Sequence, residues 1–394
     1  GSGLVNGAKY QVDVVDEFSI KLKDYKSLNG ATTNILNNTI HFASAHGFQD
    51  GDILEYQSDQ VSDNSGLHDG GRYRVTVMDA NTIQLSDSRI IDSLAISAAV
   101  AVAVSGNVSV GVAAAGAVAH NTIAGGYEAS IIRSDVDAAG DVDVVAQDSS
   151  AIRAMLFSAA VAVSASGSVA VSAAMSVAEA ENLIDASTLA TIEDSTVDTT
   201  SGGVTVEAVS DVGIQAFGIA AAISAGGAGA VSVQVAAAGV VAFNTTTSSI
   251  EASIVDTGPA GYASAVHAPG DIEVLARDES NILAVLGAVS VAAGGSGTAS
   301  INVSVAATYA ENTVAGSMIA TIADATVDSS AGAVTVDALA DDSILAVGLA
   351  VGVSAGGSGG VSVNVALSAV AATNLIGNSV EASITDGSVV SAND

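Results

Sequence analysis

The stretch AAVAVSASGSVAVSAAMSVA, residues 159–178, decides the fold. Val161 and Val163 alternate with Ala and Ser before Ser166-Gly167-Ser168, and Val169 and Val171 continue the alternation after it. A two-residue period is typical of β-strands, whose side chains point to opposite faces in turn, and a central Ser-Gly-Ser favours a turn. The stretch therefore predicts a hairpin-like or turn-broken pair of strands, with Val on one face and Ala, Ser or Gly on the other.

Similar charge-free stretches occupy residues 216–243, 284–310 and 345–372. Because both faces of such strands are small and largely apolar, we expect both to be covered. Either successive copies stack in a solenoid core, or the strands pack against another chain. Small side chains favour silk-like or zipper-like packing, and both arrangements give a stiff rod.

Residues 94–394 are predicted to hold five copies of a repeat of about 62 residues, and a fixed period of this kind decides the architecture. The marker is an Asn followed eight residues later by Ala-(Ser/Thr)-Ile. An insertion at residues 258–262 lengthens the third interval and is expected to be a surface loop. Ala-Ser-Ile alternates with Ala-Thr-Ile from copy to copy, which indicates a paired unit of about 130 residues. The marker residues are Asn121, Asn182, Asn244, Asn312 and Asn374.

The first 93 residues contain a different repeat, because residues 3–22 recur as residues 66–85 at an offset of 63. Residues 31–93 then form one complete module, and residues 1–30 are the C-terminal part of another. Alternation over 73–77 and 82–85 predicts two strands joined by a turn at 79–81, and hence a small β-barrel or β-sandwich module. Since the chain begins inside a repeat, we expect it to be a segment of a longer polypeptide.

Charge is unevenly distributed. Residues 1–94 hold 13 acidic and 7 basic side chains, whereas residues 95–394 hold 29 acidic and 3 basic ones. A negative field of this strength repels phosphates and attracts divalent cations or basic partners, so nucleic-acid binding is excluded. Cysteine is absent, so order must come from backbone pairing and the packing of small side chains. This composition suits an exported, extracellular repetitive protein.

The charge-free stretches are long enough to cross a bilayer as helices. Transmembrane helices are nevertheless not expected, since the stretches have a two-residue period and central Gly-Ser breaks, and lack flanking basic clusters and aromatic anchors.

One string of residues spans the N-terminal module: His46-Gly47-Phe48, Gly51-Asp52, Tyr56, Gly66-Leu67, Gly70, Tyr73, Val75, Val77, Asp79, Thr82-Ile83 and Leu85. This string resembles a β module of giant repetitive bacterial surface proteins, in which similar modules alternate with Ala/Val/Gly-rich β repeats. The resemblance covers essentially the whole chain and implies a very large, exported, adhesin-like or matrix protein of β-solenoid character.

Acidic turn residues raise a calcium hypothesis, because equivalent positions in stacked copies form ladders of carboxylates that repel one another. A bridging Ca²⁺ would reverse this repulsion with oxygen ligands from Asp and the backbone. The alternative is a solvated acidic face that keeps the rod soluble, and the Gly-Gly-x-Gly-x-Asp repeats of calcium-binding β-rolls are missing. The candidate ligands are Asp194, Asp198, Asp256, Asp324, Asp328 and Asp386.

The histidines and the Gly-rich clusters are interpreted as structural features and not as catalytic or phosphate-binding sites. His46 with Asp50 and Asp52 is interpreted as a turn. The Gly-rich clusters at 226–227, 294–297 and 356–360 are also interpreted as turns, since no Lys or helix start follows them as in a phosphate-binding loop. The remaining histidines occupy non-equivalent positions, and none belongs to a recognisable catalytic set. These are His41, His68, His120 and His267.

The sequence thus favours a non-enzymatic structural protein that forms an extended stalk, sheath or filament and self-associates through its charge-free strands. One alternative is an adhesin whose module at 31–93 binds a glycan or a cell surface, with the repeats as spacer. A β-helix enzyme that degrades polysaccharides is a third reading. Three scattered arginines in the repeat region, Arg133, Arg153 and Arg277, argue against it, because such chemistry needs clustered carboxylates with basic or metal partners.

Overall fold

The computed structural model describes residues 89–258 and 263–392 continuously. Before them it describes the segments 10–16, 19–24, 26–29, 34–36, 39–42, 47–48, 53–57 and 72–87. The chain divides into two compact units, Gly1–Ile90 and Ile91–Asp394. The described residues form strands and turns, so the all-β prediction is confirmed, and no helix that could cross a membrane is found among them.

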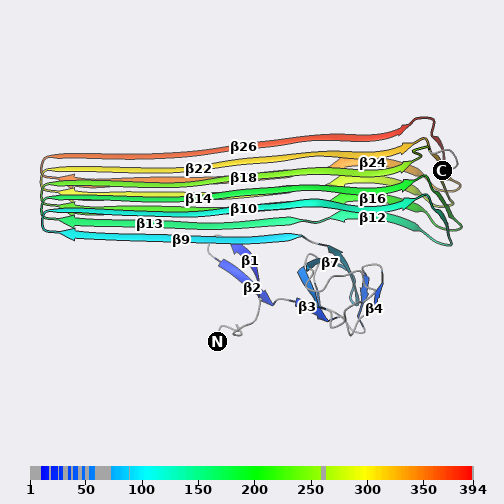
Figure 1. Ribbon diagram of the computed structural model, residues 1–394, viewed down its shortest axis with the longest axis horizontal. Coiled ribbons are helices and arrows are strands. Elements are labelled where there is room, and N and C mark those ends of the chain that lie inside the picture. Colours follow the sequence, from blue (N-terminus) through cyan, green and yellow to red (C-terminus); the bar gives the residue numbers. More distant parts are fainter. Residues whose placement is uncertain are drawn as a thin grey trace. The chain divides into compact units, whose positions relative to one another are not determined.

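Each coil of the second unit folds one long strand back over another (Figure 1). In the second coil, β13 (Ala151–Ser166) leads to a two-residue turn, and the 25-residue strand β14 (Val169–Glu193) returns. The short strand β15 (Thr196–Thr199) closes the other end, and β16 (Val204–Ser210) leads into the next coil. At about 3.3 Å per residue, a 25-residue strand is about 80 Å long.

The other coils repeat this order. The first coil holds β9 (Ile90–Ser105), β10 (Val108–Ile132), β11 (Asp135–Ala138) and β12 (Val142–Asp148). The third holds β17 (Gly213–Ala228), β18 (Val231–Val255), β19 (Ala265–Ala268) and β20 (Ile272–Asp278). The fourth holds β21 (Asn281–Ser296), β22 (Ala299–Ala323), β23 (Thr326–Ser329) and β24 (Val334–Ala340). The fifth holds β25 (Ser343–Ser358), β26 (Val361–Thr385) and β27 (Val389–Ala392).

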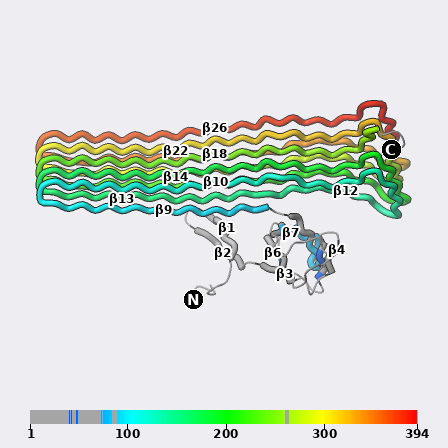
Figure 2. Tube along the Cα trace, in the orientation of Figure 1, coloured from blue at the N-terminus to red at the C-terminus, as the bar shows by residue number. Residues whose placement is uncertain are grey.

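Equivalent strands of successive coils pair in parallel, so each of the first four coils adds one strand to each sheet and the described part of the fifth adds one strand to three of them. The long sheet has the order β10-β14-β18-β22-β26, and the 16-residue sheet has the order β25-β21-β17-β13-β9. The short strands form two further sheets, β11-β15-β19-β23-β27 and β12-β16-β20-β24. This stacking of parallel strands confirms the predicted solenoid-like repeat, and Figure 2 shows the strands running side by side from coil to coil.

The predicted turn-broken pair of strands is confirmed, but its hairpin character is wrong. β13 and β14 belong to different sheets and do not form a ladder with each other. They pack face to face as an arch, and their backbone groups bond to neighbouring coils instead. The Val residues of this pair face outward, and the Ala and Ser residues that alternate with them face inward, so the predicted separation of Val from Ala and Ser is confirmed.

Small side chains fill the space between the two large sheets near the arch turns. This part of the core consists mainly of Ala, including Ala160, Ala174 and Ala220. At the opposite end, larger side chains such as Ile192, Val206 and Ile254 form a second cluster. Along each coil, the core therefore changes from small Ala side chains near the arch turn to larger Ile and Val side chains at the opposite end.

Leucine and glycine alternate at one inward position of the 16-residue sheet. Leu156 and Leu286 lie in the second and fourth coils, and register aligns them with Gly218 and Gly348 in the third and fifth. A Cβ atom on Gly218 would lie 2.4 Å from Cγ1 of Val240, so the glycine makes room for a valine of the facing sheet. This alternation has the two-coil period that the sequence predicts.

The N-terminal unit contains a two-stranded sheet, β1-β2, and a six-stranded sheet in the order β3-β6-β7-β8-β5-β4. Ile40, Tyr73, Val75 and Ile83 form its described core. Both β1-β2 and β7-β8 are antiparallel and 63 residues apart, in agreement with the repeat, and the turn at 80–81 is confirmed. A closed barrel or sandwich stays a prediction. The strands are β1 (Tyr10–Asp16), β2 (Ser19–Asp24), β3 (Lys26–Asn29), β4 (Asn34–Leu36), β5 (Thr39–His41), β6 (Ile53–Gln57), β7 (Arg72–Asp79) and β8 (Thr82–Asp87).

Candidate functional site: an apolar lobe and an acidic end

One half of every coil, around the arch turn, carries no charged side chain. We call this half the apolar lobe. It includes most of the 16-residue strand, the turn, and the first ten residues of the 25-residue strand. It comprises residues 93–117, 154–178, 216–240, 284–308 and 346–370.

The outer faces of the apolar lobe are exposed although they consist mainly of aliphatic and aromatic side chains. Ile219 and Ile223 on the 16-residue sheet are 49% and 41% exposed, and Met175 and Ile301 on the long sheet are 54% and 41% exposed. The small, largely apolar faces of these strands predict that both faces are covered. Within the described residues the chain covers only the inner face, because each coil contributes just two layers of sheet.

A ladder of buried asparagines runs through the middle of the long sheet. The repeat marker aligns from coil to coil, and each side-chain amide donates to the carbonyl oxygen of the next at 2.7–2.8 Å. Asn244 and Asn312 are completely buried. The sequence identified these residues as a marker but missed their role. Their recurrence two residues after an Ala in all five copies was the available signal, since an amide on the inward face of a strand needs a partner when it is buried.

The Gly-rich clusters do not lie mainly in turns, which corrects the prediction. Gly226 and Gly294 lie near the ends of β17 and β21 and face amide side chains of the long sheet. A Cβ on Gly226 would lie 2.3 Å from Nε2 of Gln234, and one on Gly294 would lie 2.6 Å from Oδ1 of Asn302. These glycines provide space for buried amides, whereas Gly297 belongs to an arch turn.

The acidic end of each coil begins where the 25-residue strand stops. Asp194, Asp324 and Asp386 follow directly and adopt left-handed φ angles of 49°, 52° and 56°. Asp tolerates this conformation better than most residues, so the acidic side chain marks a sharp corner. Arg133 occupies the same corner of the first coil with a φ of 47°.

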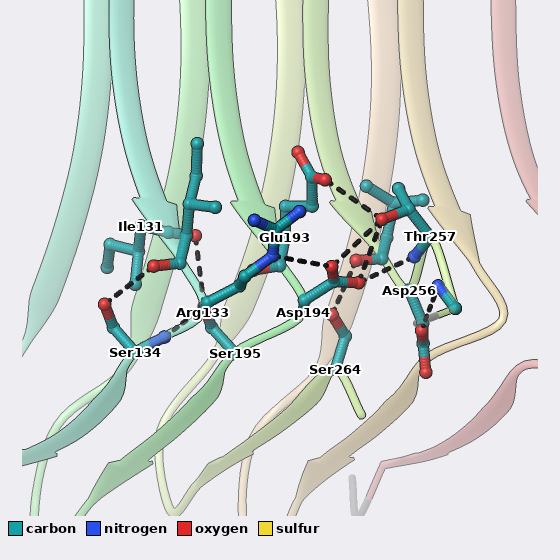
Figure 3. Close-up of polar contacts among 12 residues, drawn as sticks. Ile131, Arg133, Ser134, Glu193, Asp194, Ser195, Asp256, Thr257 and Ser264 are labelled. Carbon is teal, nitrogen blue, oxygen red and sulfur yellow. Dashed lines mark hydrogen bonds and ion pairs between the residues drawn. The ribbon is translucent and has the colours of Figure 1, made fainter. Parts of the chain in front are cut away.

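Contacts between three coils meet at Asp194, as Figure 3 shows. Its carboxylate accepts a 2.8 Å hydrogen bond from the backbone N–H of Thr257 in the next coil. Nε of Arg133, in the preceding coil, lies 3.5 Å from the same carboxylate. The N–H of Thr257, followed by its hydroxyl and Arg133, holds the pKa of Asp194 below its usual range against the opposing effect of burial. Asp194 therefore links coils through contacts within the chain.

The other candidate calcium ligands occupy different places. Asp256 accepts a hydrogen bond from the N–H of Gly258, within its own turn. Asp198 and Asp328 lie on the closing strands β15 and β23, and register inserts His267 between them. No group of three or more His, Cys, Asp or Glu side chains in the described part of the chain has the arrangement of a metal site. Calcium binding stays a prediction.

A second set of carboxylates, which the sequence does not reveal, lies buried or partly buried where the 7-residue strands meet the 16-residue strands. Asp278 is 1% exposed and accepts a 2.6 Å hydrogen bond from the Ser280 hydroxyl. Burial raises the pKa of Asp278 to about 6. Asp342 accepts a bond from the Ser280 N–H at 2.9 Å, and burial raises its pKa as well. The signal available in the sequence was the recurrence of an Asp two coils apart, because Asp148 occupies the position equivalent to Asp278.

The remaining sequence candidates give no catalytic arrangement among the described residues. His120 lies on the outer face of β10 with Nδ1 3.2 Å from a carboxylate oxygen of Glu181. His41 lies in β5 as predicted. His46, Asp50, Asp52 and His68 lie outside the described residues, as does most of the insertion at 258–262.

No known protein family, no curated protein and no solved structure matches this chain.

Proposed function

We propose that this chain belongs to a structural, extracellular repeat protein that forms an extended stalk, sheath or filament, and that it self-associates through the apolar lobe. One observation carries the proposal: the lobe exposes apolar side chains on both outer faces of every coil. Soluble monomers rarely expose continuous apolar patches of more than a few hundred Å².

Two further features support a structural role. Every long strand is hydrogen-bonded in parallel to its neighbours, and polar ladders such as the buried asparagines link all five coils. Solenoids of this kind extend by adding coils, so length grows without a new fold. The acidic end supplies the negative charge that keeps such a rod soluble.

Negative-stain electron microscopy of the purified chain tests the proposal. Rods, fibres or side-by-side pairs, in a proportion that increases with protein concentration, are the expected result. Compact, monomer-sized particles at all concentrations would contradict a role in assembly.

A further inference from the structure

The two outer faces of the apolar lobe differ, and the difference identifies a pairing surface. The outer face of the 16-residue sheet carries the larger side chains, among them Phe157, Phe217, Ile219 and Leu349. The outer face of the long sheet in the lobe is built from Val, Ala, Gly and single Met, Ile and Leu residues, without an aromatic ring. Aromatic and large aliphatic side chains are enriched in the buried centres of protein interfaces.

The surroundings of the two faces also differ in charge. Next to the lobe on the long sheet lie three carboxylates, Glu179, Glu181 and Glu311, and one imidazole, His120, which is 3.2 Å from Glu181. Next to the lobe on the 16-residue sheet, the outward position holds Asp92, Arg153, Gln215, Leu283 and Leu345, so its charges cancel. Two copies meeting through the long sheet would bring carboxylates together, whereas two copies meeting through the 16-residue sheet would not.

We propose that the outer face of the 16-residue sheet pairs with the same face of a second copy of this chain around a two-fold axis. This inference rests on the proposed function and names its partner and surface. The face consists of six outward positions on each of five strands. The central strand, β17, contributes Phe217, Ile219, Ala221, Ile223, Ala225 and Gly227.

The area of this face agrees with a stable dimer. Outward residues are about 6.7 Å apart along a strand and strands are about 4.8 Å apart, so each outward residue covers about 32 Å² and the face covers about 960 Å². A standard protein interface buries about 800 Å² on each partner. The largest apolar patch of a typical monomer is about 300–600 Å², so this face exceeds what a monomer usually leaves exposed.

Strand spacing favours a second copy over other occupants. Rows of side chains on the face repeat at the spacing of the strands, and a surface with the same repeat can interdigitate with it along its whole length. A lipid bilayer fits less well, because the arch turns and the strand edges would bring unpaired backbone groups into hydrocarbon.

A pair of matched substitutions tests the surface. Ile223 on the 16-residue sheet and Ile301 on the long sheet are the same residue type, and both are 41% exposed in the apolar lobe. Ile223→Lys places an unpaired ammonium group within the proposed interface, and we expect it to raise the dimer dissociation constant at least about 100-fold. Ile301→Lys should leave it within about threefold of the unmodified chain. Analytical ultracentrifugation measures all three proteins, and circular dichroism checks that both variants keep the β spectrum and melting temperature of the unmodified chain.

Each outcome discriminates. If both substitutions weaken dimerisation equally, or if neither weakens it, the choice of face is wrong, although self-association itself still stands. If Ile301→Lys alone disrupts association, the long sheet is the interface and the inference is wrong. An unmodified chain that stays monomeric and floats with phosphatidylcholine vesicles would identify lipid as the occupant. A chain that is monomeric without vesicle binding would overturn both this inference and the proposed function.

Discussion

Replacing Asn244 with Leu tests whether the asparagine ladder holds the coils together. Asn244 is completely buried, donates a hydrogen bond to Asn312 at 2.7 Å, and accepts one from Asn182 at 2.7 Å. Leu fills similar space but removes both bonds, which leaves a buried N–H on Asn182 and a buried carbonyl oxygen on Asn312 without partners. Each orphaned group costs about 1–3 kcal/mol, so we expect the free energy of unfolding to fall by about 2–6 kcal/mol.

Asn374→Leu is the matched control. Asn374 belongs to the same ladder, accepts only from Asn312, and is exposed in the fifth coil. Its removal leaves one buried group, the side-chain N–H of Asn312, without a partner, so the expected loss is about 1–3 kcal/mol, half of that for Asn244→Leu. Urea unfolding followed by circular dichroism gives both values, provided that the slope with urea stays that of the unmodified chain.

Asn244→Asp separates hydrogen bonding from packing. It preserves the shape, but an ionised carboxylate has no hydrogen to donate to Asn312. Burial should raise the folded-state pKa above the unfolded value, so this variant should be most stable at low pH and lose stability as pH rises. A loss for Asn244→Leu no larger than that for Asn374→Leu would refute the ladder's role.

Three further predictions concern other parts of the chain. Gly218→Leu should cost about 1–3 kcal/mol by overpacking against Val240, and adding Val240→Ala should recover at least about half of the loss; additive effects in a double-mutant cycle would contradict the proposed fit. Asp278 has a folded-state pKa of about 6, above its usual 3.8, so its contribution to stability is fully present below about pH 3.8 and is lost as pH rises through 6. Asp278→Asn should remove this pH dependence, which is worth on the order of 2–3 kcal/mol. If the melting temperatures of both proteins change with pH in the same way from pH 4 to 7, the raised pKa of Asp278 is contradicted. The calcium hypothesis predicts a higher melting temperature in millimolar Ca²⁺ than in EDTA and a smaller difference for Asp198→Asn, and identical curves would end it.

The sequence predicted the solenoid because its two signals are local and periodic. Alternation of Val with Ala and Ser defines strand faces, and an Asn that recurs in every copy defines a coil. Neither signal distinguishes a hairpin from an arch, because both join two strands of the same pattern by a short turn. The choice depends on whether backbone groups bond to the adjacent strand or to the next coil, which is a long-range property.

The parts that were missed depend on pairs of residues that face each other across the core. Gly226 and Gly294 were interpreted as turn residues, because a glycine cluster usually marks a turn. Glycine occupies these positions because the side-chain amides of Gln234 and Asn302 on the opposite sheet fill the space that a Cβ atom would need. The buried carboxylate of Asp278 was missed for a similar reason, since its burial depends on the junction of two sheets.

The asparagine ladder also answers a problem that the composition creates. Strands of alternating Ala, Ser and Val look much the same after a slip of two residues, so the small-residue core alone specifies register weakly. A two-residue slip of one coil would move Asn244 from Asn182 to Ala180 or Ile184, with a buried amide left unbonded on both strands. Every shifted coil would thus lose stability through buried amides without hydrogen-bond partners, whereas the correct register pairs the amides of all coils. Register is therefore fixed near the middle of the long strand, and the apolar lobe beyond it can vary its side chains without losing alignment.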